Sequence, residues 1–411
     1  MQRRRFLFSM AGAAASGYTP VSGARIARIT VAPIQGRFHK FVAMNSYDEA
    51  PKGHTYENWL VRVLTGEGAE GIGVMSGRPT AEFQSAARKL LGADPMSVYR
   101  MEKGRITGRA AAYDDLLRRY CHLDGPLFDL VGKLTGKPCW KLIGEAVRDR
   151  VEVYDGTLYF ADVWFRDRGA RAVVEEAEEA VRTGYLGMKF KAGRGWKWLE
   201  KQAGLERDIE VLKAVRKAVG PAPKILADAN NGYRDDFEGG WRLLEATADV
   251  SLYWMEEIFP ENTGDYRRLR ERMERVGLKT LIADGESVSD PEAFGPYLKP
   301  ERLIDVLQMD IRRGGFLANL AMARMGEAAG AISVPHNWAS QVGLFMGLHL
   351  AKAVKSVTAA EDDRSTCDLI LAEGYEFRDG YYTVSDAPGL GIRIDERLYR
   401  QKSEPGAITI V

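Results

Sequence analysis

Acidic, basic and histidine side chains recur at nearly even intervals along the second half of this 411-residue chain, each at the end of a strand-like run. Successive positions lie about 24 to 37 residues apart, which suits one strand plus one return helix of a (β/α)8 barrel. Such a barrel gathers the carboxyl ends of its strands on one face, so the spacing predicts one shared active site. The positions are Lys189 and Lys191 in MKFK, Asp228 in ILADANNGY, Glu256 in LYWMEEIFP, Glu286 in LIADGES, Asp310 in VLQMDI, His336 in ISVPHNW and Glu361 in SVTAAEDD.

Three of these side chains form a candidate metal site. Asp228, Glu256 and Glu286 would end three successive strands and so offer three carboxylate ligands. Ligands of this kind suit Mg²⁺, which keeps its other positions for water and substrate oxygens. A single carboxylate would more simply be a solvated or capping residue, but three at matched spacing favour Mg²⁺. Glu257 is expected to point to the opposite face of the strand and not to be a ligand.

The two lysines of MKFK predict a base beside that metal. Lys189 and Lys191 are one residue apart in a strand, so both amines project to the same side. Two ammonium groups and a nearby cation disfavour one another's charge, and we expect this to lower a lysine pKa toward the range of a base. Lys189 is expected to face the substrate carboxylate and Lys191 to reach the proton alpha to it, while the metal stabilises the enediolate. An isolated Lys-x-Lys would more simply be a solvated pair.

Asp310 and His336 predict a second acid/base group. They end successive strands, and a carboxylate that fixes the tautomer of an imidazole and raises its basicity makes a competent pair. The alternative is a histidine that is only hydrogen-bonded in its loop. Glu361 could donate a hydrogen bond to the enediolate if it is protonated. Its neighbours Asp362 and Asp363 leave that choice open, and so does a capping role.

The segments between these positions alternate between strand and helix patterns from Val151 onward, and eight strand candidates fill a barrel. Before them, three strand-like runs with a turn at 66–71 precede a region of helical periodicity at 81–142. The predicted fold is α/β, a modified (β/α)8 TIM-type barrel with an N-terminal α+β capping domain. The predicted divisions are an export signal at 1–24, the capping domain at 25–145, the barrel at 146–370 and a C-terminal segment returning to the capping domain at 371–411.

The N-terminus differs in character from the rest. Residues 3–7 read RRRFL, an Ala/Gly-rich run follows, and no acidic residue occurs before Asp48. This pattern resembles a twin-arginine export signal and predicts a bacterial protein exported to the periplasm or beyond, with cleavage between residues 15 and 24. The alternative is a disordered basic tail on a cytoplasmic protein. The run is too short and too poor in Leu, Ile and Val for a transmembrane helix.

The charge composition indicates which classes of binding partner to expect. Fifty-eight basic and 57 acidic residues leave a net charge of +1, so no overall field favours nucleic acid or an anionic membrane. We therefore expect no nucleic-acid partner and no membrane span. The three cysteines form no CxxC pair, and they are expected to be reduced or buried thiols without a metal or redox role.

Several motifs in a fixed order resemble those of the enolase superfamily, in particular its mandelate racemase subgroup. The resemblance covers residues 25–411 and implies a capping domain over a modified barrel, one Mg²⁺, abstraction of a proton alpha to a carboxylate, and a homo-oligomer. Members of the muconate cycloisomerase subgroup carry a lysine where this chain has Asp310. Pro260 follows the Glu-Glu pair two residues later than usual, so that loop is expected to differ. The motifs are LFDLVGKLTGKPCWKLIGE, MKFK, DAN, WMEE, DGES, MDIRRGG, PHNW and DGYYTVSDAPGLGIRID.

The same resemblance implies roles for single residues. It implies that Asp228, Glu256 and Glu286 bind the metal, that Lys191 is the base on one face, and that Asn230 is a polar neighbour of metal and substrate. It places the Asp310–His336 pair on the face of the substrate opposite to Lys191.

Catalytic residues on two faces of the substrate permit two kinds of reaction. We favour dehydration of an aldonic or aldaric acid to a 2-keto-3-deoxy acid, because acid-sugar dehydratases dominate the subgroup. The alternative is a racemase or epimerase of a 2-hydroxy acid, and a non-catalytic sugar-acid binding protein would not need both faces. Asn45, Tyr47 and His54 are expected to bind substrate hydroxyls from a single capping-domain loop, RFHKFVAMNSYDEAPKGH. Trp338 is expected to wall the pocket.

Overall fold

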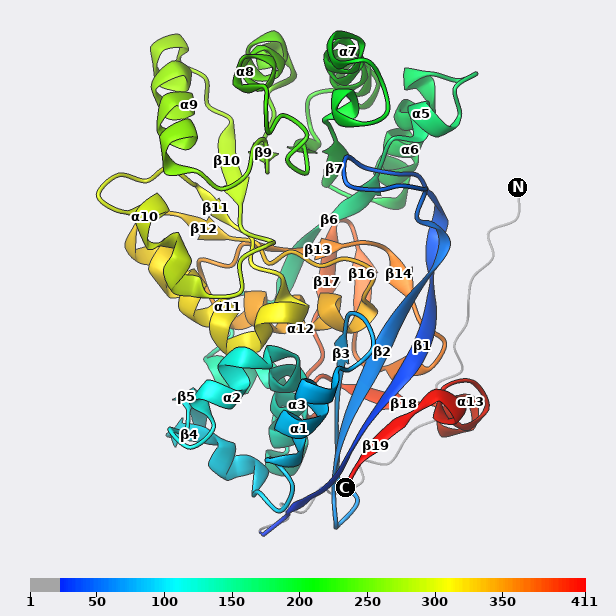
Figure 1. The fold of residues 1–411 in the computed structure, drawn as a ribbon, viewed down its shortest axis with the longest axis vertical. Coiled ribbons are helices and arrows are strands. Elements are labelled where there is room, and N and C mark those ends of the chain that lie inside the picture. The colour runs from blue at the N-terminus through cyan, green and yellow to red at the C-terminus, as the bar shows by residue number, and fades with distance from the viewer. Residues whose placement is uncertain (1–22) are drawn as a thin grey trace.

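A computed structural model describes residues 23–411 of the chain (Figure 1). The predicted export signal at residues 1–24 lies almost wholly outside the described residues. Across residues 23–411, no helix combines the length and the apolar character that a membrane crossing requires.

Eight parallel strands of the described residues form a barrel, and each neighbouring pair from β6 to β12 is hydrogen-bonded in chain order. The barrel closes because β13 pairs with β6 and a parallel bridge joins Ser333 to Val357. This confirms the predicted modified TIM-type barrel with an N-terminal capping domain. The strands are β6 (Arg150–Leu158), β7 (Gly187–Lys191), β8 (Lys224–Asp228), β9 (Trp254–Glu256), β10 (Leu281–Asp284), β11 (Val306–Leu307), β12 (Ile332–Ser333) and β13 (Ala359–Asp362).

Helices connect the barrel strands up to β13, as the alternating pattern predicts. The longer helices present an apolar face to the strands. Such a face allows each helix of a right-handed crossover to pack back onto the sheet. The chain departs from a regular barrel after β13, where it runs into β14 (Ser365–Thr366), a strand that pairs with β1 of the capping domain. The helices are α5 (Ala161–Trp164), α6 (Ala170–Thr183), α7 (Lys201–Val219), α8 (Phe237–Ala246), α9 (Thr263–Val276), α10 (Gly295–Leu298), α11 (Ile311–Ala328) and α12 (Gln341–Ala353).

The capping domain is built on an antiparallel meander of β1 (Ile26–Val42), β2 (Gly53–Thr65) and β3 (Glu70–Met75). The expected turn at 66–71 joins β2 to β3. The segment 37–54 differs from its sequence interpretation as one loop, because residues 37–42 continue β1 and 53–54 begin β2. Only residues 43–52 form the connecting loop. The long strand pair carries this loop over the barrel, beside β7 and α5 (Figure 1).

The region at 81–142 is less helical than its periodicity predicts. It contains an antiparallel hairpin of β4 (Tyr99–Glu102) and β5 (Arg105–Arg109), which the turn residues Lys103 and Gly104 connect with positive φ angles. Short strands of mixed polarity leave little periodic signal, so the hairpin was not predicted. The helices of this region are α1 (Ala81–Arg88), α2 (Asp114–Arg119), α3 (Asp124–Thr135) and α4 (Cys139–Ile143).

The C-terminal segment returns to the capping domain at its end, as expected, and an earlier part of it extends the barrel sheet. β17 (Tyr381–Thr383) pairs with β6, so β16 (Glu376–Arg378) and β17 extend the barrel sheet. β15 (Ile370–Ala372) pairs with β18 (Ile392–Ile394). After α13 (Glu396–Lys402), β19 (Ile408–Ile410) joins the capping sheet beside β1.

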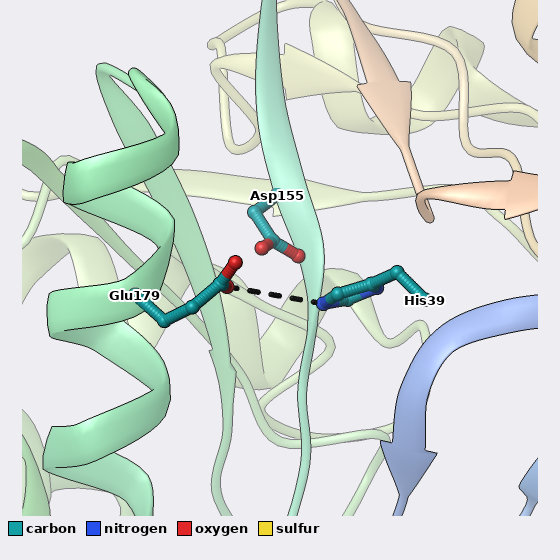
Figure 2. A group of neighbouring side chains, drawn as sticks. All are labelled: His39, Asp155 and Glu179. Carbon is teal, nitrogen blue, oxygen red and sulfur yellow. Dashed lines mark ion pairs between the residues drawn. The ribbon is translucent and has the colours of Figure 1, made fainter. Parts of the chain in front are cut away.

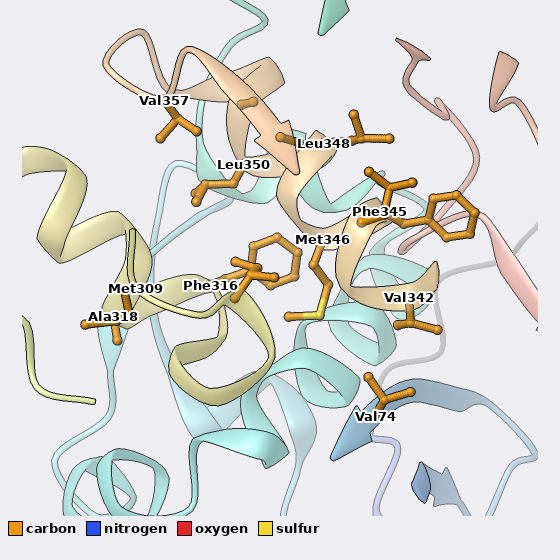
Figure 3. Packing of buried hydrophobic residues seen from close by; sticks show 14 of the residues in the cluster. Val74, Met309, Phe316, Ala318, Val342, Phe345, Met346, Leu348, Leu350 and Val357 are labelled. Carbon is orange, nitrogen blue, oxygen red and sulfur yellow. The ribbon is translucent and has the colours of Figure 1, made fainter. Parts of the chain in front are cut away.

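One continuous apolar core joins the capping domain to the barrel. Phe128 of α3 stacks on Phe316 of α11 with ring centroids 4.6 Å apart. Figure 3 shows Phe316 beside Met346 of α12, with Val74 of β3 close by. A fully buried aromatic side chain contributes about 2 kcal/mol, so this packing holds the capping domain against α11 and α12. Those are the helices that follow Asp310 and His336.

Acid is expected to destabilise the protein through His349 of α12. This ring is fully buried: its Nδ1 accepts from Trp140 N at 3.1 Å, and its Nε2 lies 2.8 Å from the Tyr375 hydroxyl. Burial, with the nearby charge of Lys352, lowers the pKa of His349 to about 3. As the pH falls below the unfolded pKa of about 6.5, the unfolded chain binds a proton that the folded chain does not. The His349 contribution to the free energy of unfolding therefore decreases from pH 6.5 toward pH 3.

Denaturant titrations at pH 7 and pH 5 measure this loss. We expect it to be smaller in His349→Gln than in wild type by about 2 kcal/mol, because the substitution removes the titrating ring. His54→Gln, at an exposed histidine, should keep the wild-type loss. An equal loss in wild type and His349→Gln would contradict the assignment.

Candidate functional site

The three predicted metal ligands meet at the carboxyl ends of β8, β9 and β10. One carboxylate oxygen from each of Asp228, Glu256 and Glu286 can be chosen so that all three lie within 4.8 Å of one another. Asp228 and Glu256 end their strands and are buried, whereas Glu286 lies two residues beyond β10 and is 17% exposed. Three strands that are well separated in the sequence therefore bring these carboxylates together.

Both lysines of β7 point into the same cluster. The ammonium of Lys191 contacts Asp228 Oδ2, and Lys189 Nζ lies 2.8 Å from Glu256 Oε1 and 2.7 Å from Glu361 Oε1. Burial opposes their charge, but these carboxylates outweigh it and raise the pKa of both lysines. The expected lowering depends in part on a bound cation, so it stays a prediction. For Lys191, the charge of Lys189 lowers the pKa, and the charge of Asp228 outweighs that effect.

Glu257 also belongs to this cluster, contrary to the expectation that it faces away. β9 ends at Glu256, and Glu257 has a φ of 43°, so strand alternation does not extend to it. Its Oε2 accepts hydrogen bonds from Asn230 Nδ2 and the Tyr47 hydroxyl, each at 3.2 Å. Burial and the charges of Glu286 and Asp228 raise the pKa of Glu257 well above its usual range.

The cluster carries more negative than positive charge. Burial raises the pKa of Glu256 to about 7, and the charges of Asp228, Glu361 and Glu286 add to this effect against the opposing charge of Lys189. Among the described residues, Glu286 Oε2 and Glu257 Oε1 are buried and make no hydrogen bond. Excess carboxylate charge with unsatisfied oxygens fits a hard divalent cation such as Mg²⁺.

Asp310 and His336 form the predicted pair. His336 Nδ1 lies 3.0 Å from Asp310 Oδ2, so Nε2 is the atom turned to the carboxylate cluster, 3.3 Å from Glu286 Oε2. Burial opposes a charged ring, but Glu286, Glu361 and Asp310 raise the pKa of His336 to about 9. Asp310 also caps α11, since its Oδ1 accepts from Arg312 N at 2.7 Å.

Glu361 ends on the opposite side of Lys189 from Glu256. Its Oε1 is the 2.7 Å partner of Lys189, and its Oε2 accepts from Asn337 N at 3.0 Å. A Cβ atom at Gly156 of β6 would lie 2.8 Å from Glu361 Oε1, so a larger residue there would displace this carboxylate. Its neighbours Asp362 and Asp363 bind Tyr185 and Ser340 instead.

The loop at 43–52 brings two of the predicted substrate-binding residues to the site. Asn45 Nδ2 donates to Asn230 Oδ1 at 2.9 Å, and the Tyr47 hydroxyl reaches Glu257. Between them, Ser46 Oγ lies 2.9 Å from Ala229 O and 3.0 Å from Ala192 O, beyond the ends of β8 and β7. Hydrogen bonds from this hydroxyl to backbone carbonyls hold the loop against the barrel.

The other two predicted substrate-binding residues differ from each other. His54 is exposed and packs edge-on against Phe41, with no contact to the carboxylate cluster among the described residues. Trp338 is partly buried, stacks on Phe38 at 5.0 Å and lies 4.9 Å from the Tyr159 ring. His54 therefore lies apart from the site, and the role of Trp338 as a wall of the pocket stays a prediction.

Three further residues touch the site and were not singled out from the sequence. Gln308 Nε2 and Trp254 Nε1 donate to Glu256 Oε2 at 3.0 and 3.1 Å, and Arg312 Nη2 lies 2.7 Å from Asp310 Oδ2. Gln308 and Trp254 each lie two residues before a predicted site residue, so strand alternation could have identified them. Arg312 lies in a helix, where no such rule applies.

A second acidic group with a histidine lies where β1 crosses β6 and α6. Figure 2 shows His39, Asp155 and Glu179 converging, with His39 Nε2 3.9 Å from Glu179 Oε2. The guanidinium of Arg364 already lies 3.0 Å from Asp155 Oδ2 and 2.7 Å from Glu179 Oε2. This cation takes the place that a metal would need, so the group is an ion-pair cluster between capping domain and barrel.

Comparisons with known proteins match most of the chain. A family model described as enolase C-terminal domain-like matches residues 172–398. Arabinonate dehydratase of Saccharolobus solfataricus is 29% identical over 68% of this chain and 70% of its own. D-galactarolactone cycloisomerase of Agrobacterium fabrum is 28% identical over 82% of this chain and 88% of its own. A structure of mutant galacturonate dehydratase from Geobacillus sp., complexed with Mg, is 28% identical with a TM-score of 0.80, covering 96% and 98%.

Proposed function

Because the chain belongs to the enolase C-terminal domain-like family, we propose that it is a Mg²⁺-dependent acid-sugar dehydratase that begins by removing the proton alpha to a carboxylate. The membership confirms the resemblance to the enolase superfamily. The observation that carries the proposal is the placement of Lys191 and His336. Lys191 flanks the carboxylate cluster at Asp228, and His336 Nε2 flanks it at Glu286. The relatives named arabinonate and galacturonate dehydratase support this reaction class.

The metal would be held by Asp228, Glu256 and Glu286. When bound, Mg²⁺ supplies positive charge beside the substrate carboxylate and draws the charge of these ligands away from the lysines. Lys189, held between Glu256 and Glu361, keeps its ammonium beside the substrate carboxylate.

Two side chains then move protons. The neutral amine of Lys191 accepts the proton from C2, and the electron pair of that bond forms the C2–C3 double bond as the C3 hydroxyl departs. His336 Nε2 donates its proton to that hydroxyl, which leaves as water. The resulting enol takes up a proton at C3 and loses the proton of its C2 hydroxyl, which gives a 2-keto-3-deoxy acid. Asp310 holds the His336 tautomer that presents Nε2–H, because it accepts from Nδ1.

A product screen tests the proposal. The full chain is incubated with Mg²⁺ and a panel of aldonic and aldaric acids, and 2-keto-3-deoxy products are measured. We expect turnover of at least one acid that stops when EDTA removes the metal. Exchange of the C2 hydrogen with D₂O without loss of water would instead support a racemase or epimerase. Neither product nor exchange across the panel would contradict both.

Two further expectations are part of the proposal. The first is export directed by the arginine-containing segment 1–24 of a bacterial protein, which fractionation of cells expressing wild type and Arg3→Lys/Arg4→Lys tests. The second is a homo-oligomer, which light scattering of the purified protein tests.

A further inference from the structure

An aromatic wall leads away from Lys191. The ring centroid of Tyr159, the residue after β6, lies 5.0 Å from Lys191 Nζ. The Tyr159 ring lies 4.9 Å from that of Trp338, which stacks on Phe38 of β1 at 5.0 Å. These three rings belong to one apolar cluster at the boundary of capping domain and barrel. Phe38 and Tyr159 are buried and Trp338 is partly exposed, so Trp338 is the ring of this cluster that a substrate can contact.

The loop at 43–52 brings one charged pair to this wall. Lys52 Nζ lies 6.0 Å from the Trp338 ring centroid and 2.6 Å from Asp48 Oδ1. The second oxygen of Asp48 accepts a hydrogen bond from Asn45 N at 2.9 Å, which holds the carboxylate in place. The side chains of Asp48 and Lys52 are 12% and 29% exposed. The positive charge of Lys52 beside Trp338 is therefore already paired with the negative charge of Asp48.

Two other basic side chains next to this region are also paired. Lys197 donates to Tyr47 O at 2.9 Å and contacts the Glu49 carboxylate. Arg312 is bound to Asp310. Neither side chain offers a free positive charge to a second substrate carboxylate.

We propose that the substrate is a monocarboxylic sugar acid whose uncharged, hydroxylated end lies on Trp338 and binds the Lys52–Asp48 pair. This inference rests on the proposed function and narrows it to acids with one carboxylate. The ammonium of Lys52 can donate to a sugar hydroxyl and Asp48 can accept from one, while the ring offers an apolar face to the C–H bonds. A second carboxylate would lie near Asp48 with little solvent screening, or would have to break the pair.

Matched acids test the inference. Each pair has the same configuration at C2 to C5 and differs at C6, which is a hydroxymethyl group in one acid and a carboxylate in the other. In wild type we expect kcat/KM for the monoacid to exceed that for the diacid by about 10-fold or more. Asp48→Asn frees the charge of Lys52 and should raise the diacid/monoacid ratio by about 10-fold. Asp249→Asn removes a charge of the same kind far from this loop, on a 70% exposed side chain paired with Lys213, and should leave the ratio unchanged.

Binding is measured separately by calorimetry with Mg²⁺, so that the two proposals fail in different ways. A diacid that binds and reacts as well as its monoacid overturns this inference and leaves the dehydratase intact. A monoacid that binds more tightly but gives neither product nor C2 exchange overturns the proposed function and supports the neutral subsite. Failure of every acid to bind overturns both. An unchanged ratio in Asp48→Asn, in a variant that melts like wild type, also overturns the inference.

Discussion

Replacing Lys191 by methionine is expected to lower kcat/KM by about 1,000-fold, the scale of a lost general base. The ammonium of Lys191 is buried and contacts Asp228, so no other described amine except Lys189 can approach C2 from that side. Methionine keeps most of the side-chain volume and removes the proton acceptor. The measurement is steady-state turnover of the best acid from the screen, together with exchange of its C2 hydrogen in D₂O.

The control for this variant is Lys213→Met, on an exposed lysine of α7 that pairs with Asp249. It removes the same charge from the surface and should keep wild-type activity. Melting curves of both variants show whether the fold is retained. If Lys191→Met were folded and retained one tenth or more of wild-type turnover, Lys191 would not be the base.

Loss of the metal is expected to have an effect of similar size. Glu286→Gln tests the ligand set, and Glu286 Oε2 makes no hydrogen bond among the described residues. The same oxygen lies 3.3 Å from His336 Nε2, so Mg²⁺ affinity, measured apart from turnover, is the readout that isolates the ligand role. We expect weaker Mg²⁺ binding by about 100-fold and a loss of turnover at Mg²⁺ concentrations that saturate wild type. Mg²⁺ should also raise the melting temperature of wild type, since it binds only the folded state, and should raise it less in the variant.

A matched control for the metal comes from the second acidic group. Glu179→Gln alters a carboxylate of the His39–Asp155–Glu179 group, where Arg364 already supplies the positive charge. Mg²⁺ affinity in that variant should equal that of wild type. Equal Mg²⁺ affinity in wild type and Glu286→Gln, measured by calorimetry, would remove Glu286 from the ligand set.

The main errors of the sequence interpretation come from strand ends that were placed at the wrong residue. Glu257 was assigned to the far face because strand alternation was extended one residue beyond the end of β9. His54 was grouped with Asn45 and Tyr47 because all three lie in one polar segment. In the structure, His54 lies in β2 and only the other two lie in the loop at 43–52 that reaches the barrel. Both errors concern the exact end of a strand, which alternation of side chains alone does not define.

Spacing and alternation in the sequence were enough to predict the barrel and the lysine, carboxylate and histidine side chains named at its strand ends, but not Glu257, Gln308 or Trp254. Regular spacing along the chain sets the order of parallel strands, and alternation within a strand sets which side chains share a face, so both can be read without knowing any long-range contact. The tertiary structure alone decided which charges meet. Lys191 has Asp228 as its partner, Lys189 lies between Glu256 and Glu361, and the Lys52–Asp48 pair lies at Trp338. Such pairings depend on distances of a few ångströms between segments far apart in the chain, and these distances set the sign of a pKa shift.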